Sequence, residues 1–329
     1  MAVQIQRKTG DFWVKRYGIM LMGAFFIVLA VAGLSSAEPV EQRMFGSPEE
    51  AVKALISALK SKDLKALEGI FGPDSEDLVS SGDSVADEGR REKFIALYEE
   101  KHRLQEESGE KVFVYVGKED WPFPVPIIKE KSLWHFDGRE GREEILARRI
   151  GRNELSAIQV CLGYVDAQRE YVRKDSDSDG FLEYARKFRS DAGKKNGLYW
   201  ETGEGDENSP LGAFFAAAEE EGYDLKQPDR KPSPYYGYYY KILTAQGENA
   251  PGGAYDYVVK GKMLGGFALV AYPAQYGVSG IMTFVVNHNG IVYQKDLGEN
   301  TKQSAQAMKL FNPDGTWIKV EEKDMGAKG

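Results

Sequence analysis

The chain has 329 residues, a formal net charge of −8 and a single cysteine. The acidic balance argues against nucleic acid and against unassisted binding to an anionic lipid surface, and one cysteine excludes an internal disulfide. The length suffices for one large domain or two ordinary ones, and the 36 glycines, 18 tyrosines and 16 phenylalanines indicate a part of the chain that is rich in sheet and turns.

The chain begins with the pattern of a secretory signal. Lys15 and Arg16 precede an uncharged apolar run that ends at Leu34, and small residues lead to a cleavage site after Ala37. We therefore expect residues 1–37 to be a signal peptide and the protein to be periplasmic. The alternative is an uncleaved segment, because the apolar run reaches the lower length limit of a membrane-spanning helix. In that case the N-terminal segment would anchor the protein in the membrane.

Residues 38–150 predict a small domain in which helices come first and a sheet follows. Ser47, Pro48 and Glu50 combine an N-cap, a proline at the first helical position and a capping-box carboxylate. This order of elements resembles the cone-shaped nuclear-transport-factor-2-like domains, a likeness of fold that implies no activity. We expect helices over 48–59, 63–70 and 84–104, strands over 112–116 and 127–136, and an edge or irregular segment over 121–126.

Residues 151–329 predict a second α+β domain. Apolar residues at helical spacing indicate a long helix over about 143–174, which Gly151 interrupts, and we place the domain boundary there. The Asn-Gly pair at 289–290 favours a tight turn between two strands. The other predicted elements are helices over 182–188 and 210–221 and strands over 235–244, 267–271, 281–287 and 291–295.

A long helix followed by an antiparallel sheet resembles the globular heads of type IV pilins and type II pseudopilins. The resemblance covers roughly residues 152–298 and implies a pilin-head-like fold. Its carriers are residues 166–171, 236–242, 267–273, 280–284 and 290–293.

An acidic loop after the long helix is a candidate calcium site. Asp175, Asp177 and Asp179 alternate before Gly180, so their carboxylates can converge on one hard cation, and Glu183 stands where an EF-hand loop places its ninth-position ligand. An arginine occupies the position of the final bidentate glutamate, which argues against a complete EF-hand. The alternative is a solvated acidic turn that binds no metal.

Aromatic residues gather in the C-terminal half. In a strand, Tyr235 and Tyr239 would lie on one face and Tyr236, Tyr238 and Tyr240 on the other. One set would belong to the core, and the other would be free to contact a protein or glycan partner. We take Tyr235, Tyr239 and Trp200 as the candidate partner-binding residues, with cross-strand packing as the alternative.

No catalytic signature stands out in the sequence. His102, His135 and His288 lack metal-ligand spacing with one another or with Cys161. We therefore expect a non-enzymatic envelope protein that binds a partner or assembles through its tyrosine-rich sheet. The alternative is a cell-envelope hydrolase or ligand-binding enzyme with an inter-domain cleft. The candidate cleft carboxylates are Asp166, Glu170 and Asp256.

Several sequence segments of the mature chain are similar to those of a bacterial family known as domain of unknown function 2950. The similarity covers nearly the full length and implies an exported bacterial protein, but it brings no activity with it. The matching phrases are residues 45–51, 120–124, 148–154, 197–200, 250–257 and 295–298.

Overall fold

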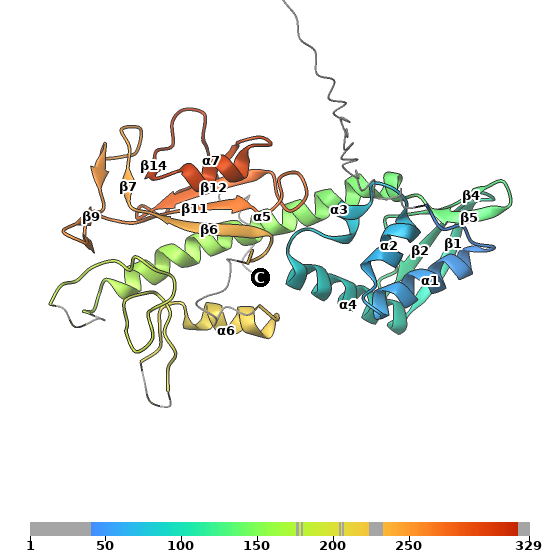
Figure 1. Cartoon of the computed structure of the whole chain (residues 1–329), viewed down its shortest axis with the longest axis horizontal. Helices are drawn as coiled ribbons and strands as arrows, with labels where there is room; N and C mark the ends of the chain where they lie inside the picture. The colour runs from blue at the N-terminus through green and yellow to red at the C-terminus, as the bar shows by residue number, and fades with distance from the viewer. Residues whose placement is uncertain are drawn as a thin grey trace, which may run out of the picture. The chain divides into compact units, whose positions relative to one another are not determined.

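The computed structural model describes residues 41–175, 178, 180–203, 205, 207–223 and 233–321. Within these ranges the protein combines helices with mainly antiparallel sheets, so the predicted α+β class is confirmed (Figure 1). No helix in the described part of the chain is both long enough and apolar enough to span a bilayer. The predicted signal peptide lies outside the described residues.

Side-chain caps begin three helices of the N-terminal part. The side chains of Ser47, Asp63 and Asp83 each accept a hydrogen bond from the backbone N–H three residues later, at 3.2, 3.0 and 3.1 Å. Each bond satisfies an N–H group that has no partner within its helix. The helices of this part are α1 (Pro48–Lys60), α2 (Leu64–Phe71), α3 (Glu76–Val79) and α4 (Ser84–Glu100).

The first sheet differs from prediction at two points. The helix expected over 84–104 ends at Glu100, and the next residues form a strand. The strand expected over 127–136 is a hairpin that turns at Lys131, whose φ is +59°. The sheet order is β1-β2-β4-β5, with β3 paired to β2. Its strands are β1 (His102–Ser108), β2 (Lys111–Val116), β3 (Trp121–Pro122), β4 (Ile127–Glu130) and β5 (Leu133–Phe136).

The four helices and the first sheet enclose one hydrophobic core. Leu55 of α1, Leu67 of α2 and Ile127 of β4 are fully buried in it. Apolar side chains recur at helical spacing in α1 and on alternate positions in β2, so each element turns one face to this core. This core lies in residues 45–136, with Ile145 packed against it.

Helix α5 (Gly138–Tyr171) is continuous over 34 residues and runs from the first sheet to the second (Figure 1). Asp137 caps it by accepting hydrogen bonds from two backbone N–H groups at 3.1 Å. Gly151 does not interrupt the helix, contrary to expectation, because its helical backbone is sterically ordinary and other residues of α5 make the packing contacts. The two large cores lie on either side of this point in the sequence.

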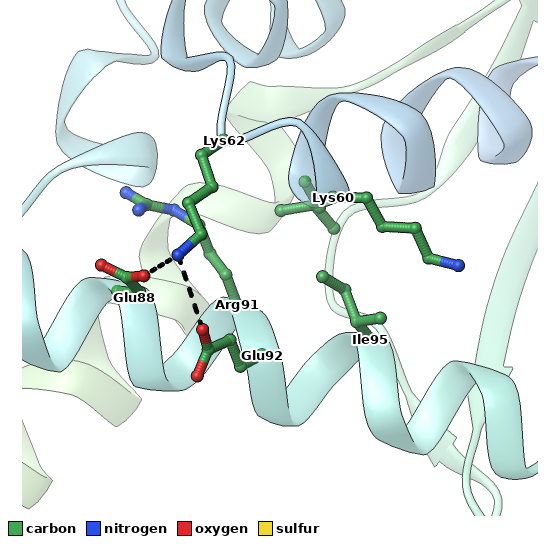
Figure 2. A pocket seen from close by; sticks show the side chains of 7 residues that line it. Lys60, Lys62, Glu88, Arg91, Glu92 and Ile95 are labelled. Atoms are coloured by element: carbon green, nitrogen blue, oxygen red, sulfur yellow. Dashed lines mark hydrogen bonds and ion pairs between the residues drawn. The ribbon is translucent and has the colours of Figure 1, made fainter. Parts of the chain in front are cut away.

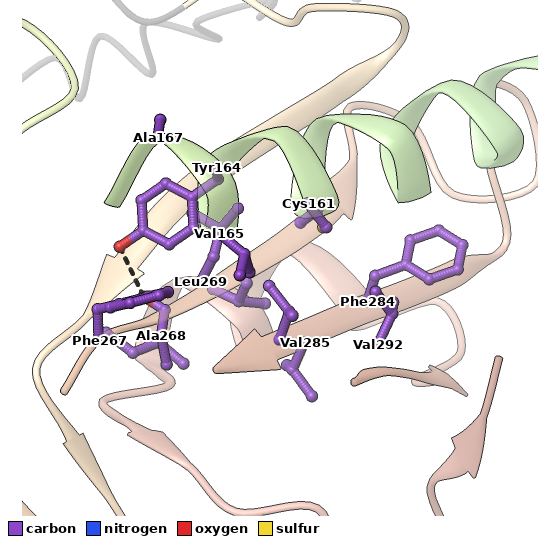
Figure 3. Packing of buried hydrophobic residues seen from close by; sticks show 14 of the residues in the cluster. Cys161, Tyr164, Val165, Ala167, Phe267, Ala268, Leu269, Phe284, Val285 and Val292 are labelled. Carbon is purple, nitrogen blue, oxygen red and sulfur yellow. Dashed lines mark hydrogen bonds between the residues drawn. The ribbon is translucent and has the colours of Figure 1, made fainter. Parts of the chain in front are cut away.

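The second sheet packs against the C-terminal half of α5. Cys161 and Val165 of the helix contact the strands that carry Leu269 and Val285 (Figure 3). Tyr164 adds a hydrogen bond from its hydroxyl to the carbonyl oxygen of Ala268 at 3.4 Å. The sheet is antiparallel in the order β15-β13-β12-β11-β6. Its strands are β6 (Tyr238–Leu243), β11 (Ala268–Pro273), β12 (Met282–Asn287), β13 (Val292–Asp296) and β15 (Ile318–Lys319).

Short elements complete the C-terminal half. The helix predicted over 182–188 is absent, because Tyr184 forms a β-bridge with Met263 and the surrounding backbone is irregular. The helix predicted over 210–221 is present as α6. The remaining elements are α6 (Gly212–Glu220), β7 (Ala245–Gln246), β8 (Tyr255–Asp256), β9 (Val258–Val259), β10 (Lys262–Met263), α7 (Thr301–Ala307) and β14 (Leu310–Phe311).

Candidate functional site

A pocket of about 700 Å³ lies between α4, α5 and the β2–β3 region, and we take it as the candidate functional site. Its volume falls within the range of about 300–1,000 Å³ that is typical of small-molecule sites. The residues that line it come from both halves of the described chain.

One end of the pocket is apolar. Phe94 and Phe123 meet there with their ring centroids 4.9 Å apart, and Phe71 lies 6.3 Å from Phe123. The buried core residues beneath them form a floor without charged groups. Other apolar residues of the lining are Leu55, Leu59, Leu67, Leu97, Val116 and Ile145, whereas Val79 lies beside the arginines, because its carbonyl oxygen accepts a hydrogen bond from Arg91 at 2.7 Å.

The other end is cationic. Along α4 the basic residues precede Phe94 and Leu97, and along α5 they follow Ile145, so each helix contributes a charged and an apolar segment to the lining. Among the described residues of the lining, the acidic ones are Asp87 and Glu221. Basic side chains therefore predominate in this described part of the lining, although the chain carries −8 overall. The basic residues are Arg90, Arg91, Lys93, Arg148, Arg149 and Arg152.

Arg149 is a buried cation without a carboxylate hydrogen-bond partner. Its Nη1 donates to the carbonyl oxygen of Asp77 at 2.5 Å and its Nη2 to that of Leu78 at 2.9 Å. These acceptors orient the guanidinium but do not neutralise it. Burial, followed by repulsion from Arg90, lowers the pKa of Arg149 to about 10.

Arg152 lies one turn further along α5 and is exposed at the pocket. Among the described residues, no carboxylate and no hydrogen-bond acceptor engages its guanidinium. Partial burial, together with the neighbouring Arg90 and Arg148, lowers the pKa of Arg152. For both arginines burial is the largest cause, and repulsion from neighbouring arginines adds to it, while Asp87 and Asp77 partly offset it at Arg149.

The carboxylates beside these arginines already have partners. Asp87 is buried and accepts hydrogen bonds from the backbone N–H and the hydroxyl of Ser81, at 2.8 and 2.7 Å, and it pairs with Arg90. Glu221 accepts a hydrogen bond from the hydroxyl of Tyr236 at 2.6 Å. Both carboxylates of the described lining therefore already accept hydrogen bonds from neighbouring groups.

Asp83 fixes the start of α4 against the C-terminal half of the chain. Its Oδ2 accepts hydrogen bonds from the Tyr223 hydroxyl at 3.0 Å and from the backbone N–H of Gly237 at 2.7 Å. Burial, reinforced by the charge of Asp83, raises the pKa of Tyr223, which keeps its hydroxyl a donor. Gly237 has a φ of +73°, and a β-carbon there would collide with the Asn153 side chain. The cationic end of the pocket is thus built on a fixed junction.

A smaller pocket of about 190 Å³ lies between the end of α1 and α4. Lys62 forms ion pairs with Glu88 and Glu92 there, while Lys60 points away from them and Ile95 lies between Glu92 and Lys60 (Figure 2). Lys62 and its two glutamates neutralise one another there, and Lys60 pairs with Glu99 outside the lining, so this pocket has less to offer a ligand than the larger one.

The candidate partner-binding aromatic residues do not form an open face. Tyr235 and Trp200 are 9% exposed, and Tyr239 is partly buried beside Tyr272, with ring centroids 5.6 Å apart. The alternation expected from residue 235 onward does not hold, because positive φ angles at Tyr236 and Gly237 make a two-residue turn before β6 begins. Contact of these side chains with a partner stays a prediction.

The candidate calcium ligands are described only in part. Asp175 accepts a hydrogen bond from the backbone N–H of Gly180 at 2.8 Å, while Asp177 and Asp179 lie outside the described residues. Glu183 pairs with Lys262 at 3.7 Å and accepts a hydrogen bond from the Met263 N–H at 3.1 Å. In the part of the chain that the structure describes, no three His, Cys, Asp or Glu side chains form a metal-binding group. Calcium binding stays a prediction.

The predicted cleft carboxylates do not line the candidate site. Asp166 is exposed on α5 and lies 3.6 Å from Arg169, and Glu170 and Asp256 are also exposed. The arginines that do line the site were not among the residues predicted from the sequence. Arg148, Arg149 and Arg152 recur on one side of α5 at helical spacing, and this pattern was the available signal.

Residues 42–320 match the family described as "Protein of unknown function (DUF2950)". The similarity to this family that the sequence indicates is confirmed over these residues, whereas the likeness to pilin heads is not. Neither the curated proteins nor the solved structures contain a match.

Proposed function

Since the chain belongs to the DUF2950 family, whose function is unknown, we propose a function from its own geometry. The protein is an exported, non-enzymatic binding protein that holds a small molecule with an apolar body in the pocket between α4 and α5. The observation that supports this proposal is the pocket itself, about 700 Å³ in volume and apolar at one end. Sites of this size with mainly apolar linings and few polar groups commonly hold small ligands.

The state of the polar groups favours binding over catalysis. A general base must lie within reach of the substrate's proton, and of the two carboxylates in the described lining, Asp87 is buried and holds Ser81 and Arg90, while Glu221 accepts a hydrogen bond from Tyr236. The arginines donate hydrogen bonds and do not accept them. This lining can orient a ligand without transforming it.

Export would place the ligand in the periplasm. The proposal rests on the basic, apolar and small-residue segments of residues 1–37. N-terminal sequencing of the protein from a periplasmic fraction should then begin at Glu38. Recovery of the intact Met1 end from the cytoplasmic fraction, with a known periplasmic protein correctly processed in the same cells, would contradict export.

Two exposed helical glycines, one inside the pocket lining and one outside it, allow a direct test of the pocket. Gly89 of α4 lines it and Gly151 of α5 does not, and a β-carbon at either position would meet no heavy atom within 4 Å. Gly89→Trp should fill the pocket without displacing core residues, whereas Gly151→Trp should leave it open.

The measurement is a fluorescence titration with the neutral apolar probe N-phenyl-1-naphthylamine. We expect saturable binding by the unchanged protein and by Gly151→Trp, and at least about tenfold weaker binding by Gly89→Trp, which corresponds to about 1.4 kcal/mol. Equal affinities for the two variants, or no saturable binding by any protein, would refute a binding function for this pocket.

A further inference from the structure

The pocket is polarised along its length. On α4, Arg90 precedes Phe94, and on α5, Ile145 precedes the arginines, so the cationic and apolar ends are contributed by the same two helices. A ligand that satisfies both ends must itself be polarised. An entirely apolar ligand would leave the guanidinium groups without a counter-charge in a partly desolvated site, which is unfavourable.

Two arginines of the cationic end lack a carboxylate partner among the described residues, whereas Arg148 pairs with Glu144 at 2.5 Å and Arg90 with Asp87. Arg149 is 5% exposed and hydrogen-bonds only to carbonyl oxygens, and Arg152 has no partner among the described residues. The buried carboxylates nearby are already engaged, because Asp87 is bound by Ser81 and Arg90, and Asp83 by Tyr223 and Gly237. Repulsion among Arg90, Arg148 and Arg152 contributes to the lowered pKa of Arg152. An anion from outside would relieve this repulsion.

Resting on the function proposed above, we infer that the ligand is an amphipathic anion. Its single carboxylate or phosphate head group binds at Arg152 and Arg90, and its apolar chain lies along Phe94 toward the floor of the pocket. Carboxylate and phosphate oxygens match the planar fork of N–H donors that a guanidinium presents, and such charge-assisted bonds are the strongest hydrogen bonds of their kind.

The rest of the cationic end is arranged to hold the arginines in place. The carbonyl oxygens of Asp77 and Leu78 fix Arg149. The next residues of α5 bind the second sheet, because Asn153 donates to the Ser279 carbonyl at 2.9 Å and Glu154 accepts from the Ile281 N–H at 2.9 Å. The helix that carries Arg152 therefore offers its guanidinium from a preorganised position.

A competition experiment tests the head group separately from the pocket. The probe N-phenyl-1-naphthylamine is displaced from the full mature chain by decanoate, decyl phosphate or decan-1-ol, which share one chain length and differ in the head. We expect at least one of the two anions to bind at least about tenfold more tightly than the alcohol, equivalent to about 1.4 kcal/mol. Preference between the two anions identifies the head group. The advantage over the alcohol should shrink as salt is added, because ions screen exposed charges.

Variants locate the head group. Arg152→Gln should remove most of the preference for the anion while the alcohol keeps its affinity, and Arg152→Lys should keep part of it because the charge remains without the fork. Arg139→Gln is the matched control, since Arg139 is exposed on the first turn of the same helix and does not line the pocket. The control should behave as the unchanged protein, and melting curves confirm that each variant is folded.

The outcomes separate the two proposals. If the probe and the alcohol bind but the anions have no advantage, the ligand class is refuted and the binding function stands. If an anion preference persists unchanged in Arg152→Gln, the head group does not bind at this cluster, and the inference is overturned. If the probe does not bind at all, the proposed function itself fails.

Discussion

At the scale of single residues, Asp83 connects the two halves of the described chain. One carboxylate oxygen caps α4, and the other accepts hydrogen bonds from Tyr223 and from the backbone of Gly237. The carboxylate is 2% exposed, so water cannot readily replace it as an acceptor. Loss of this side chain would remove a helix cap and leave two buried donors without a partner, which is the costlier part.

We therefore predict that Asp83→Ala lowers the free energy of unfolding by about 2–4 kcal/mol. Asp63→Ala is the matched control, because Asp63 caps α2 in the same way but bonds only to its own helix at the surface. The control should lose about 1 kcal/mol, the usual contribution of an N-cap. Urea denaturation of both variants measures the difference, and equal losses would contradict the connecting role of Asp83.

At the scale of elements, α5 carries contacts to both large cores. Its first turns approach α2 and the 124–125 segment so closely that side chains would not fit at Gly138 and Gly141. Its middle offers arginines to the pocket, and its last turns pack on the second sheet. The helix therefore fixes the cationic end of the pocket relative to both cores.

We predict that alanine substitutions at two glycines of α5 change the free energy of unfolding in opposite directions. Gly151→Ala should raise the free energy of unfolding by about 0.5–1 kcal/mol, because an exposed helical glycine costs backbone entropy and nothing obstructs a β-carbon there. Gly141→Ala should lower it by more than about 1 kcal/mol, because its β-carbon would lie 2.6 Å from Val125. Thermal melting of the two variants decides. A higher melting temperature for Gly141→Ala would contradict the close contact between Gly141 and Val125 at the start of α5.

The sequence predicted elements well where local chemistry is decisive. The caps at Ser47 and Asp63 marked two helix starts correctly, and Asn289-Gly290 marked the turn between β12 and β13. Prediction failed where tertiary contacts override local pattern. The turn at Lys131 contains no glycine that would have predicted it. The segment around Tyr184 has helical spacing in the sequence but forms a β-bridge with Met263 instead.

At the scale of the whole molecule, the site could not be assembled from the sequence. Its basic residues belong to α4 and α5, which are separated by the entire first sheet in the sequence. In the sequence, the basic residues of α4 and those of α5 each look like an ordinary charged helix surface. The acidic composition of the chain also argues against an anionic ligand. Only the packing of the two helices shows that these charges converge beside an apolar pocket.

The distribution of charge also limits which anions can bind. An acidic chain repels anions at long range, so attraction must come from the local arginines and from burial of the apolar chain. A small inorganic anion lacks the second contribution. We therefore regard the combination of both ends, and not either end alone, as the feature that defines the site.

The most direct test of this account is native mass spectrometry of the protein purified from its own cell envelope, beside Gly89→Trp and Gly151→Trp prepared in the same way. We predict a one-to-one adduct on the unchanged protein and on Gly151→Trp, with fragments that identify an acidic amphipathic molecule, and no adduct on Gly89→Trp. An adduct retained equally by Gly89→Trp would contradict the account. So would a bare protein that stays bare after incubation with decanoate and decyl phosphate.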